Sequence, residues 1–222
     1  MNTQSLIDRP LTDRKLSHAA TEYVWDVDGN IESHALLIGP VLQLLNERRA
    51  GRVLDLGCGN GAFTALLARQ GFQVEGCDGS TSGVEIARRA HPQLSFWHHD
   101  FAAPLADHLA GCYDAVVSTE VIEHLPLPRK LMESALHALK PGGLFIVTTP
   151  YHGYWKNVAI ALTGKFDDHW HPLRDFGHIK FFSRATLTTL FNEFRFANLT
   201  YTTVGRIPLL AKSMILSGSA PL

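Results

Sequence analysis

Residues 53–61 read VLDLGCGNG, an apolar run that ends in an acid and leads into a turn with a glycine at every second position. The run RVLDLG predicts a buried strand, and the Ala- and Leu-rich run AFTALLARQ after the turn predicts a helix. That helix is expected to end at Gly71, because glycine commonly stops helices. The stretch therefore predicts one unit of strand, turn and helix.

The same alternation continues along the chain. Apolar residues at helical spacing predict a helix over 34–49, before the first strand. The later predicted segments are strands over 72–78, 94–100, 113–120 and 144–150, helices over 81–90, 128–140 and 183–194, and β-like runs over 195–205 and 209–217. Strands that alternate with helices of this length form a mostly parallel sheet with helices on both faces. The sequence predicts a Rossmann-like α/β fold.

Three segments define the expected organisation of the chain. Residues 1–20 are polar and aperiodic, which is typical of a flexible arm. Residues 21–222 are expected to form a single domain. Within it, residues 151–180 are rich in aromatic residues and histidine and too long for an ordinary connection, so we expect a lid or substrate-binding insert.

Composition narrows the class of partner. The chain has 222 residues, 45% of them hydrophobic and 18% charged, and its formal net charge is -1 at pH 7. This balance is ordinary for a globular protein, and it lacks the basic excess that a nucleic-acid partner would favour. A small-molecule ligand is therefore expected, with a monomer and a homodimer both compatible with the sequence.

The termini and cysteines indicate a cytoplasmic protein. The first residues lack the apolar core of a secretory signal, and no apolar run is long enough to form a transmembrane segment. Cys58, Cys77 and Cys112 are not paired by spacing, so free thiols in a reducing compartment are expected. Residues 155–166, WKNVAIALTGKF, could touch a membrane surface, but a buried lid helix is the favoured interpretation.

An acid stands at the end of each of the first three predicted strands. Asp55 precedes the glycine turn, Asp78 ends the second strand and Asp100 ends the third. Glycines spaced for a pyrophosphate usually read G-x-G-x-x-G, whereas here they alternate. A carboxylate beside a backbone that a ligand can approach closely suits a cationic donor such as S-adenosylmethionine (AdoMet). Asp78 would then bind the ribose, and Asp100 would bind the adenine, whose ring Phe101 would cover.

The fourth strand is followed by a cluster of potential metal ligands. Glu120, Glu123 and His124 are spaced so that a helical turn would bring them to one face, and His178 of the insert could supply a fourth ligand. Two carboxylates with imidazoles suit a divalent ion such as Mg²⁺ or Zn²⁺. Alternatively, Glu123 and His124 cap a helix without a metal, and His152 or His178 acts as the general base.

The motifs VLDLGCGNG, CDGS, HHDF, YDAVVSTEVIEHLP and LKPGGLFIVTTP resemble the ordered motifs of class I AdoMet-dependent methyltransferases, over roughly residues 50–150. The resemblance implies a seven-stranded sheet with an antiparallel last strand, supplied here by AKSMILS. It also implies that Asp55, Asp78 and Asp100 bind the methionine part, ribose and adenine. The other donor contacts implied are Gly57, Cys58, Gly59, Asn60, Gly61, Gly79, Ser80, Phe101 and Glu120.

Two narrower resemblances concern the acceptor. Glu-x-x-Glu-His followed by a later histidine is similar to the metal-dependent small-RNA 2′-O-methyltransferases. WDVDGNIESHALLIGPVLQLL and GHIKFFSRATL resemble segments of the 3-demethylubiquinol O-methyltransferase family. The chain departs from that family in lacking its basic residue just after the proline, which puts recognition of the donor carboxylate and the identity of the acceptor in doubt.

Together these patterns predict an AdoMet-dependent enzyme that methylates an oxygen of a small aromatic or polyhydroxylated acceptor, with a metal ion as an option. The expected catalytic residues are Glu123, His124, His152 and His178. Three alternatives stay open: an N- or C-methyltransferase on the same scaffold, a 2′-O-methyltransferase of an RNA end, and a non-catalytic AdoMet-binding module.

Overall fold

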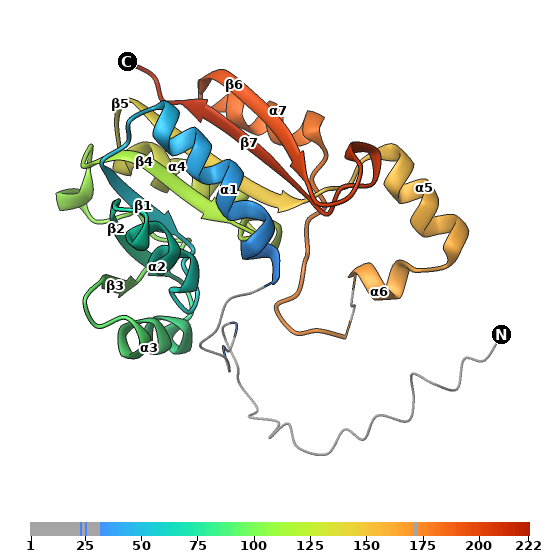
Figure 1. Ribbon diagram of the computed structural model, residues 1–222, viewed down its shortest axis with the longest axis horizontal. Coiled ribbons are helices and arrows are strands. Elements are labelled where there is room, and N and C mark those ends of the chain that lie inside the picture. Colours follow the sequence, from blue (N-terminus) through green and yellow to red (C-terminus); the bar gives the residue numbers. More distant parts are fainter. Residues whose placement is uncertain (1–22, 24, 26–31, 171–172) are drawn as a thin grey trace.

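A computed structural model describes Tyr23, Trp25 and residues 32–170 and 173–222 (Figure 1). Within them, seven strands form one sheet in the order β3-β2-β1-β4-β5-β7-β6. The strands are β1 Arg52–Leu56, β2 Gln73–Asp78, β3 Ser95–His98, β4 Tyr113–Thr119, β5 Leu139–Pro150, β6 Ala197–Val204 and β7 Ser213–Ser219. The flexible arm expected over residues 1–20 lies outside the described residues.

The direction of the strands confirms the predicted fold class. Strands β1 to β5 pair in parallel, whereas β7 is antiparallel to both β5 and β6. The antiparallel strand is the segment that the family resemblance implied. Several boundaries differ by a few residues. The largest difference is at β5, which begins at Leu139 instead of residue 144, so the helix expected over 128–140 ends at Ala138.

Helices cover both faces of the sheet (Figure 1). They are α1 Glu32–Glu47, α2 Ala62–Arg69, α3 Thr81–Ala90, α4 Pro128–Ala138, α5 Tyr154–Thr163, α6 Phe166–Trp170 and α7 Arg184–Glu193, with short 3-10 turns η2 Asp107–Leu109, η3 Ile122–His124 and η4 Pro208–Leu210. Leu37 of α1 and Phe63 of α2 lie in the buried cluster on one face. Met132 of α4 and Phe191 of α7 lie in the larger cluster on the other. The apolar faces of these helices therefore enclose the central strands.

The parallel strands place their carboxyl ends at one edge of the sheet. Asp55 of β1 is in register with Gly76 of β2, and Asp78 is in register with His98 at the end of β3. Side chains that follow these strands therefore gather at this edge, which is where open α/β sheets usually bind ligands.

The insert is less buried than the sequence suggested. Only Lys156 and Ile160 of α5 are buried, while Tyr154, Trp155 and Leu162 are among the exposed large side chains. The expectation of a buried helix is therefore wrong for most of α5, which stands beyond the end of the sheet (Figure 1). Among the described residues, no helix has both the length and the apolar character needed to cross a membrane.

Candidate active site

A cavity of about 530 Å³ crosses the carboxyl ends of β3, β2, β1 and β4. This volume lies within the range of about 300–1,000 Å³ typical of small-molecule sites. Most of the residues predicted to contact a ligand line it. They are Gly57, Cys58, Gly59, Asp78, Gly79, Ser80, Asp100, Phe101, Glu120, His124 and His178.

Asp78 organises the backbone around the cavity. One carboxylate oxygen accepts a hydrogen bond of 2.7 Å from the backbone N–H of Gly59, and the other accepts one of 2.7 Å from Ser80. The glycine turn needs its glycines here, because Gly59 has a φ of 52° and a Cβ would overlap the indole of Trp25. Asp78 therefore fixes the turn while its side chain faces the cavity.

Asp55 lies behind the turn rather than in the cavity wall. Its side chain is fully buried, and Oδ2 accepts a hydrogen bond of 2.6 Å from the hydroxyl of Thr64 on α2. Burial raises the pKa of Asp55 to about 7. Asn60 is also buried, and its side-chain oxygen accepts from the N–H of Ala62 at the start of α2. These two residues brace α2 against β1, and with Gly61 they lie outside the residues that line the cavity.

The end of β3 contributes a carboxylate and a ring. Asp100 Oδ1 accepts a hydrogen bond of 2.8 Å from the N–H of Ala102, which closes a tight turn at the cavity. The ring of Phe101 lies beside Gly79, where an added Cβ would come within 3.5 Å of it. An apolar ring next to a carboxylate can hold a flat heterocycle with an exocyclic amine.

Glu120 marks the end of β4. Its backbone is left-handed, with a φ of 56°, and the hydroxyls of Thr148 and Ser213 donate to its two carboxylate oxygens at 2.9 and 3.3 Å. Burial raises the pKa of Glu120 to about 7. Because the chain turns sharply at this residue, Glu120 does not share a helical turn with Glu123 and His124 as the sequence suggested.

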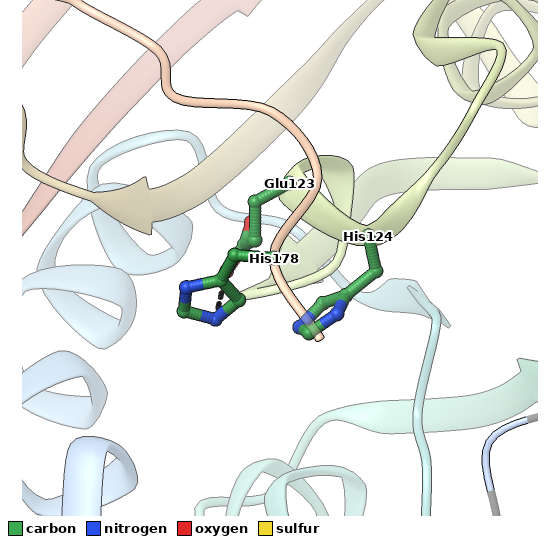
Figure 2. Close-up of side chains that lie close together, drawn as sticks. All are labelled: Glu123, His124 and His178. Carbon is green, nitrogen blue, oxygen red and sulfur yellow. Dashed lines mark ion pairs between the residues drawn. The ribbon is translucent and has the colours of Figure 1, made fainter. Parts of the chain in front are cut away.

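The side chains of Glu123, His124 and His178 converge beyond the end of β4 (Figure 2). His124 and His178 line the cavity, whereas Glu123 is not among the lining residues. One potential ligand atom from each lies within 4.8 Å of the others, and Nε2 of His178 is 3.9 Å from Oε1 of Glu123. Both oxygens of Glu123 are buried, and neither has a hydrogen-bond partner of good geometry among the described residues, although the side chain of Thr149 lies near enough to lower the pKa of this carboxyl. Burial, and then the charge of Glu120, hold the pKa of Glu123 well above its ordinary value.

The two imidazoles are held by the end of the insert. Nδ1 of His124 lies 2.9 Å from the carbonyl oxygen of Phe176, so this nitrogen carries the proton and Nε2 carries the lone pair. The backbone N–H groups of Ile179 and Lys180 donate to the carbonyl oxygen of Glu123 at 2.9 and 3.0 Å. The turn η3 and the residues around His178 are thereby fastened to each other.

His152 stands apart from this cluster. Its ring packs against Phe181, and Nδ1 lies 3.4 Å from the side-chain oxygen of Asn157. It is not among the residues that line the cavity. Among the described aromatic residues of the insert, which are Tyr151, Tyr154, Trp155, Phe166, Trp170 and Phe176, only Phe176 lines the cavity.

Sequence reasoning assigned no role at the site to several residues that line the cavity, among them Tyr23, Trp25, Ser33, His34 and Arg174. Ser80 donates to the carbonyl oxygen of Tyr23, and the N–H of Trp25 donates to Ser82, so these two aromatic residues lie along the start of α3. The aromatic residues just before a predicted helix, in TEYVWDVDG, were the available signal.

Comparison with known proteins identifies the family. A family model described as a methyltransferase domain matches residues 32–201, which is most of the chain. The chain belongs to the class I AdoMet-dependent methyltransferases.

The three cysteines of this methyltransferase, Cys58, Cys77 and Cys112, are free thiols.

Among related sequences, the chain is 32% identical over 133 residues to a ubiquinone biosynthesis O-methyltransferase of Erwinia tasmaniensis, a match that covers 56% of this chain and 54% of the relative. It is 29% identical over 177 residues to the protein of the same name in Escherichia coli, with 74% and 72% covered. The methyltransferase thus matches only about half the length of the Erwinia protein.

Solved structures share the fold at low identity. The PH0226 protein from Pyrococcus horikoshii superposes with a TM-score of 0.66 at 21% identity and covers 87% of this chain and 93% of its own. The methyltransferase domain of bacterial CtHen1 gives 0.62 at 21%, with 86% and 100% covered. The [4+2]-cyclase SpnF gives 0.64 at 18%, with 82% and 81% covered. Because a cyclase shares the fold, the fold alone does not define the reaction.

Proposed function

We propose that this methyltransferase transfers the methyl group of AdoMet to a hydroxyl oxygen of a small acceptor. The observation that carries the proposal is the composition of one continuous cavity. Carboxylates and an aromatic ring line it at the ends of β2 and β3, and two imidazoles line it beyond β4, where they lie in a cluster with the buried carboxylate of Glu123. A donor and an acceptor would therefore meet between the two sets of residues.

The donor would lie along the strand ends. Asp78 lines the cavity at the end of β2, where its carboxylate would accept hydrogen bonds from the ribose hydroxyls. Asp100 and Phe101 would take the adenine, and the glycine turn would leave room for the sulfonium and methionine parts. Asp55 would act indirectly, through the position of α2, because its side chain lies behind the turn.

The acceptor would approach from the side of the insert. Arg174, Phe176 and His178 bring the end of the insert to the cavity, so residues 151–180 would serve as a lid over the acceptor. Oxygen is favoured as the methylated atom because the relatives named above are O-methyltransferases, and because an imidazole and carboxylates can remove a hydroxyl proton. Holding the two reacting atoms in line would supply most of the acceleration.

The cluster beyond β4 fits a divalent metal ion. Glu123 has a buried carboxylate without a hydrogen-bond partner of good geometry among the described residues, and His124 directs the lone pair of Nε2 away from Phe176. Glu123, His124 and His178 would hold the ion, with Glu120 close by. Such an ion would lower the pKa of a coordinated hydroxyl and orient it. Zn²⁺ suits this mixture of oxygen and nitrogen ligands, whereas Mg²⁺ prefers oxygen and would bind chiefly through the carboxylates.

Without a metal, His178 is the better candidate for the general base. It lines the cavity and lies 3.9 Å from Glu123, whereas His152 lies outside the lining residues. Glu123 would then orient the imidazole and stabilise it when it takes the proton. The same three side chains thus serve either version of the reaction.

Calorimetry and turnover test the proposal together. AdoMet and S-adenosylhomocysteine are titrated into wild type, Asp78→Ala and the control Asp107→Ala, which removes an exposed acid. Asp78→Ala is expected to weaken binding about tenfold or more, through the loss of charge-assisted hydrogen bonds, and Asp107→Ala to leave it unchanged. Release of S-adenosylhomocysteine is then measured with catechols, vicinal diols, amines, thiols and an RNA 3′ end. Absence of donor binding to wild type would refute the proposal, and turnover of amines alone would refute the choice of oxygen.

A further inference from the structure

We infer that Arg174 selects acceptors that carry a carboxylate on the same ring as the hydroxyl that is methylated. The inference rests on the proposed function, because it deepens the description of the acceptor in that reaction. It goes further in assigning a charge to the acceptor and in naming the residue that binds this charge.

Arg174 brings an isolated positive charge to the cavity. It is the one lysine or arginine among the described residues that line the cavity, and no described carboxylate forms an ion pair with it. Its guanidinium donates to the hydroxyl of Tyr23 and lies over the ring of that residue. A guanidinium has five N–H donors, so this contact leaves donors for a second partner. A carboxylate is the partner that an arginine binds most strongly.

A tight turn holds Arg174 beside the imidazoles. The backbone N–H of Gly177 donates to the carbonyl oxygen of Arg174 at 3.0 Å, and Phe176 within the turn has a left-handed φ of 54°. The carbonyl oxygen of Phe176 lies 2.9 Å from Nδ1 of His124. One turn therefore positions both the guanidinium and an imidazole of the cluster beyond β4.

Tyr23 contacts both Arg174 and His124. The guanidinium lies 5.5 Å from the centre of the tyrosine ring, and the ring centres of Tyr23 and His124 are 6.4 Å apart. Two groups that contact the same aromatic ring are separated by no more than that ring and its two contacts. An acceptor with a hydroxyl at the imidazoles and a carboxylate on the same ring would therefore reach Arg174 within the cavity.

The charges of the cavity favour a carboxylate over a phosphate. Arg174 supplies one positive charge, whereas Asp78 and Asp100 of the same cavity supply negative charge. A singly charged carboxylate matches one guanidinium and can pair with it through two parallel hydrogen bonds. A doubly charged phosphate would meet net repulsion from the two aspartates.

Two other cations near the site are weaker candidates. Lys156 is buried, its Nζ donates to the carbonyl oxygen of Lys212 at 3.3 Å, and it is not among the described residues that line the cavity. Lys180 lines a neighbouring hollow together with Leu127, which also lines the cavity. Lys180 is therefore the rival that a test must separate from Arg174.

The test measures the preference for a carboxylate over its neutral isostere. Protocatechuate is compared with protocatechuamide, and gallate with gallamide. All four compounds are titrated by calorimetry into protein saturated with S-adenosylhomocysteine, in wild type, Arg174→Gln, Arg174→Lys and the comparison variant Lys180→Gln. Near-ultraviolet circular dichroism first confirms native packing of each variant. Because both members of a pair are measured on the same variant, a change in donor affinity cancels in their ratio.

Wild type is expected to bind the carboxylate of at least one pair about tenfold or more tightly than the carboxamide, as for a charge-assisted pair. Arg174→Gln should reduce this preference to less than about twofold. Arg174→Lys should keep part of it, because the ammonium retains the charge but not the planar fork. Lys180→Gln should keep all of it.

Three results would overturn the inference. They are no preference for either carboxylate in wild type, a preference that survives in Arg174→Gln, and a preference that is lost in Lys180→Gln. Failure of wild type to bind S-adenosylhomocysteine would instead refute the proposed function, on which the inference depends.

Discussion

Arg174 donates a hydrogen bond of 2.5 Å to the hydroxyl of Tyr23, across 151 residues of sequence. The guanidinium also lies 5.5 Å from the centre of the tyrosine ring. Both residues line the cavity, and the ring of Tyr23 lies edge-on to His124. Tyr23 and the end of the insert therefore meet at the ligand site, and we propose that this contact closes it.

Loss of this contact should speed the release of product. Tyr23→Phe removes the hydroxyl and Arg174→Gln removes the charge, and each is expected to raise the dissociation rate of S-adenosylhomocysteine a few-fold, as for a single exposed polar contact. The double variant should raise the dissociation rate by less than the product of the two single effects, because both changes break the same interaction. Stopped-flow fluorescence of Trp25 measures the rates. Arg129→Gln, which breaks an exposed ion pair with Glu193, is the control. If the dissociation rate of the double variant rose by the full product of the single effects, the two residues would not share a contact.

Glu123→Gln should weaken metal binding selectively. The amide keeps the size of the side chain but is a much poorer ligand than a carboxylate, so the affinity for Zn²⁺ or Mg²⁺ is expected to fall about tenfold or more, by analogy with losses seen when the surroundings of a metal are altered. The affinity for S-adenosylhomocysteine should change less than about twofold. Equilibrium dialysis gives the metal affinity, with Glu133→Gln on the exposed side of α4 as the control. If the wild-type protein bound neither ion and still methylated its acceptor in excess chelator, a catalytic metal would be excluded.

The fold was predictable because local patterns repeat. Each strand that is buried on both faces reads as an apolar run, and the glycine turn marks the first crossover, so the sequence places Asp78 correctly at the cavity. Asp55 shows the limit of this reasoning. Side chains alternate between the faces of a strand, and the alternation directs Asp55 to the face covered by α2, where it meets Thr64.

Contacts between distant segments were not predictable. Trp25 lies against Gly59 and Gly83, and nothing in the local sequence of either glycine indicates an indole above it. The predicted helical turn that would join Glu120 to Glu123 fails because Glu120 adopts a left-handed backbone that is uncommon for a residue with a side chain. Tertiary packing determines both features, and periodicity carries no information about it.

Gly83→Ala should disturb the donor site although it lies in a helix. An alanine in a helix normally stabilises by about 0.5–1 kcal/mol relative to glycine. At Gly83 the new Cβ would lie 2.8 Å from Cδ1 of Trp25, so the indole must move. The expected result is a shift in tryptophan fluorescence and a several-fold weaker binding of S-adenosylhomocysteine. Gly39→Ala in α1, where a Cβ meets nothing within 4 Å, is the matched control and should show neither change.

His34 should make a separable contribution to the acid dependence of stability. Its pKa is about 4 in the folded protein and 6.5 ordinarily, so between these values the unfolded chain binds more protons. The free energy of unfolding therefore falls as the pH drops from 6.5 toward 4, by about 3 kcal/mol at about 1.4 kcal/mol per pH unit. Asp55 and Glu120 act in the opposite sense. Because burial raises the pKa of each to about 7, the folded protein binds more protons below that pH, and this contribution to stability grows as the pH falls.

These opposed effects partly cancel in wild type, so the informative quantity is a difference between variants. Urea unfolding without ligand, at several pH values from 4.5 to 7, is compared for wild type, His34→Asn and the exposed control His108→Gln. Asparagine does not titrate, so His34→Asn should lose less stability than wild type over this interval, and His108→Gln should follow wild type. If the free energy of unfolding changed equally with pH in wild type and His34→Asn, protonation of His34 would not destabilise the folded protein. A charged imidazole would then have to be accommodated at the start of α1, which the burial of Nδ1 opposes.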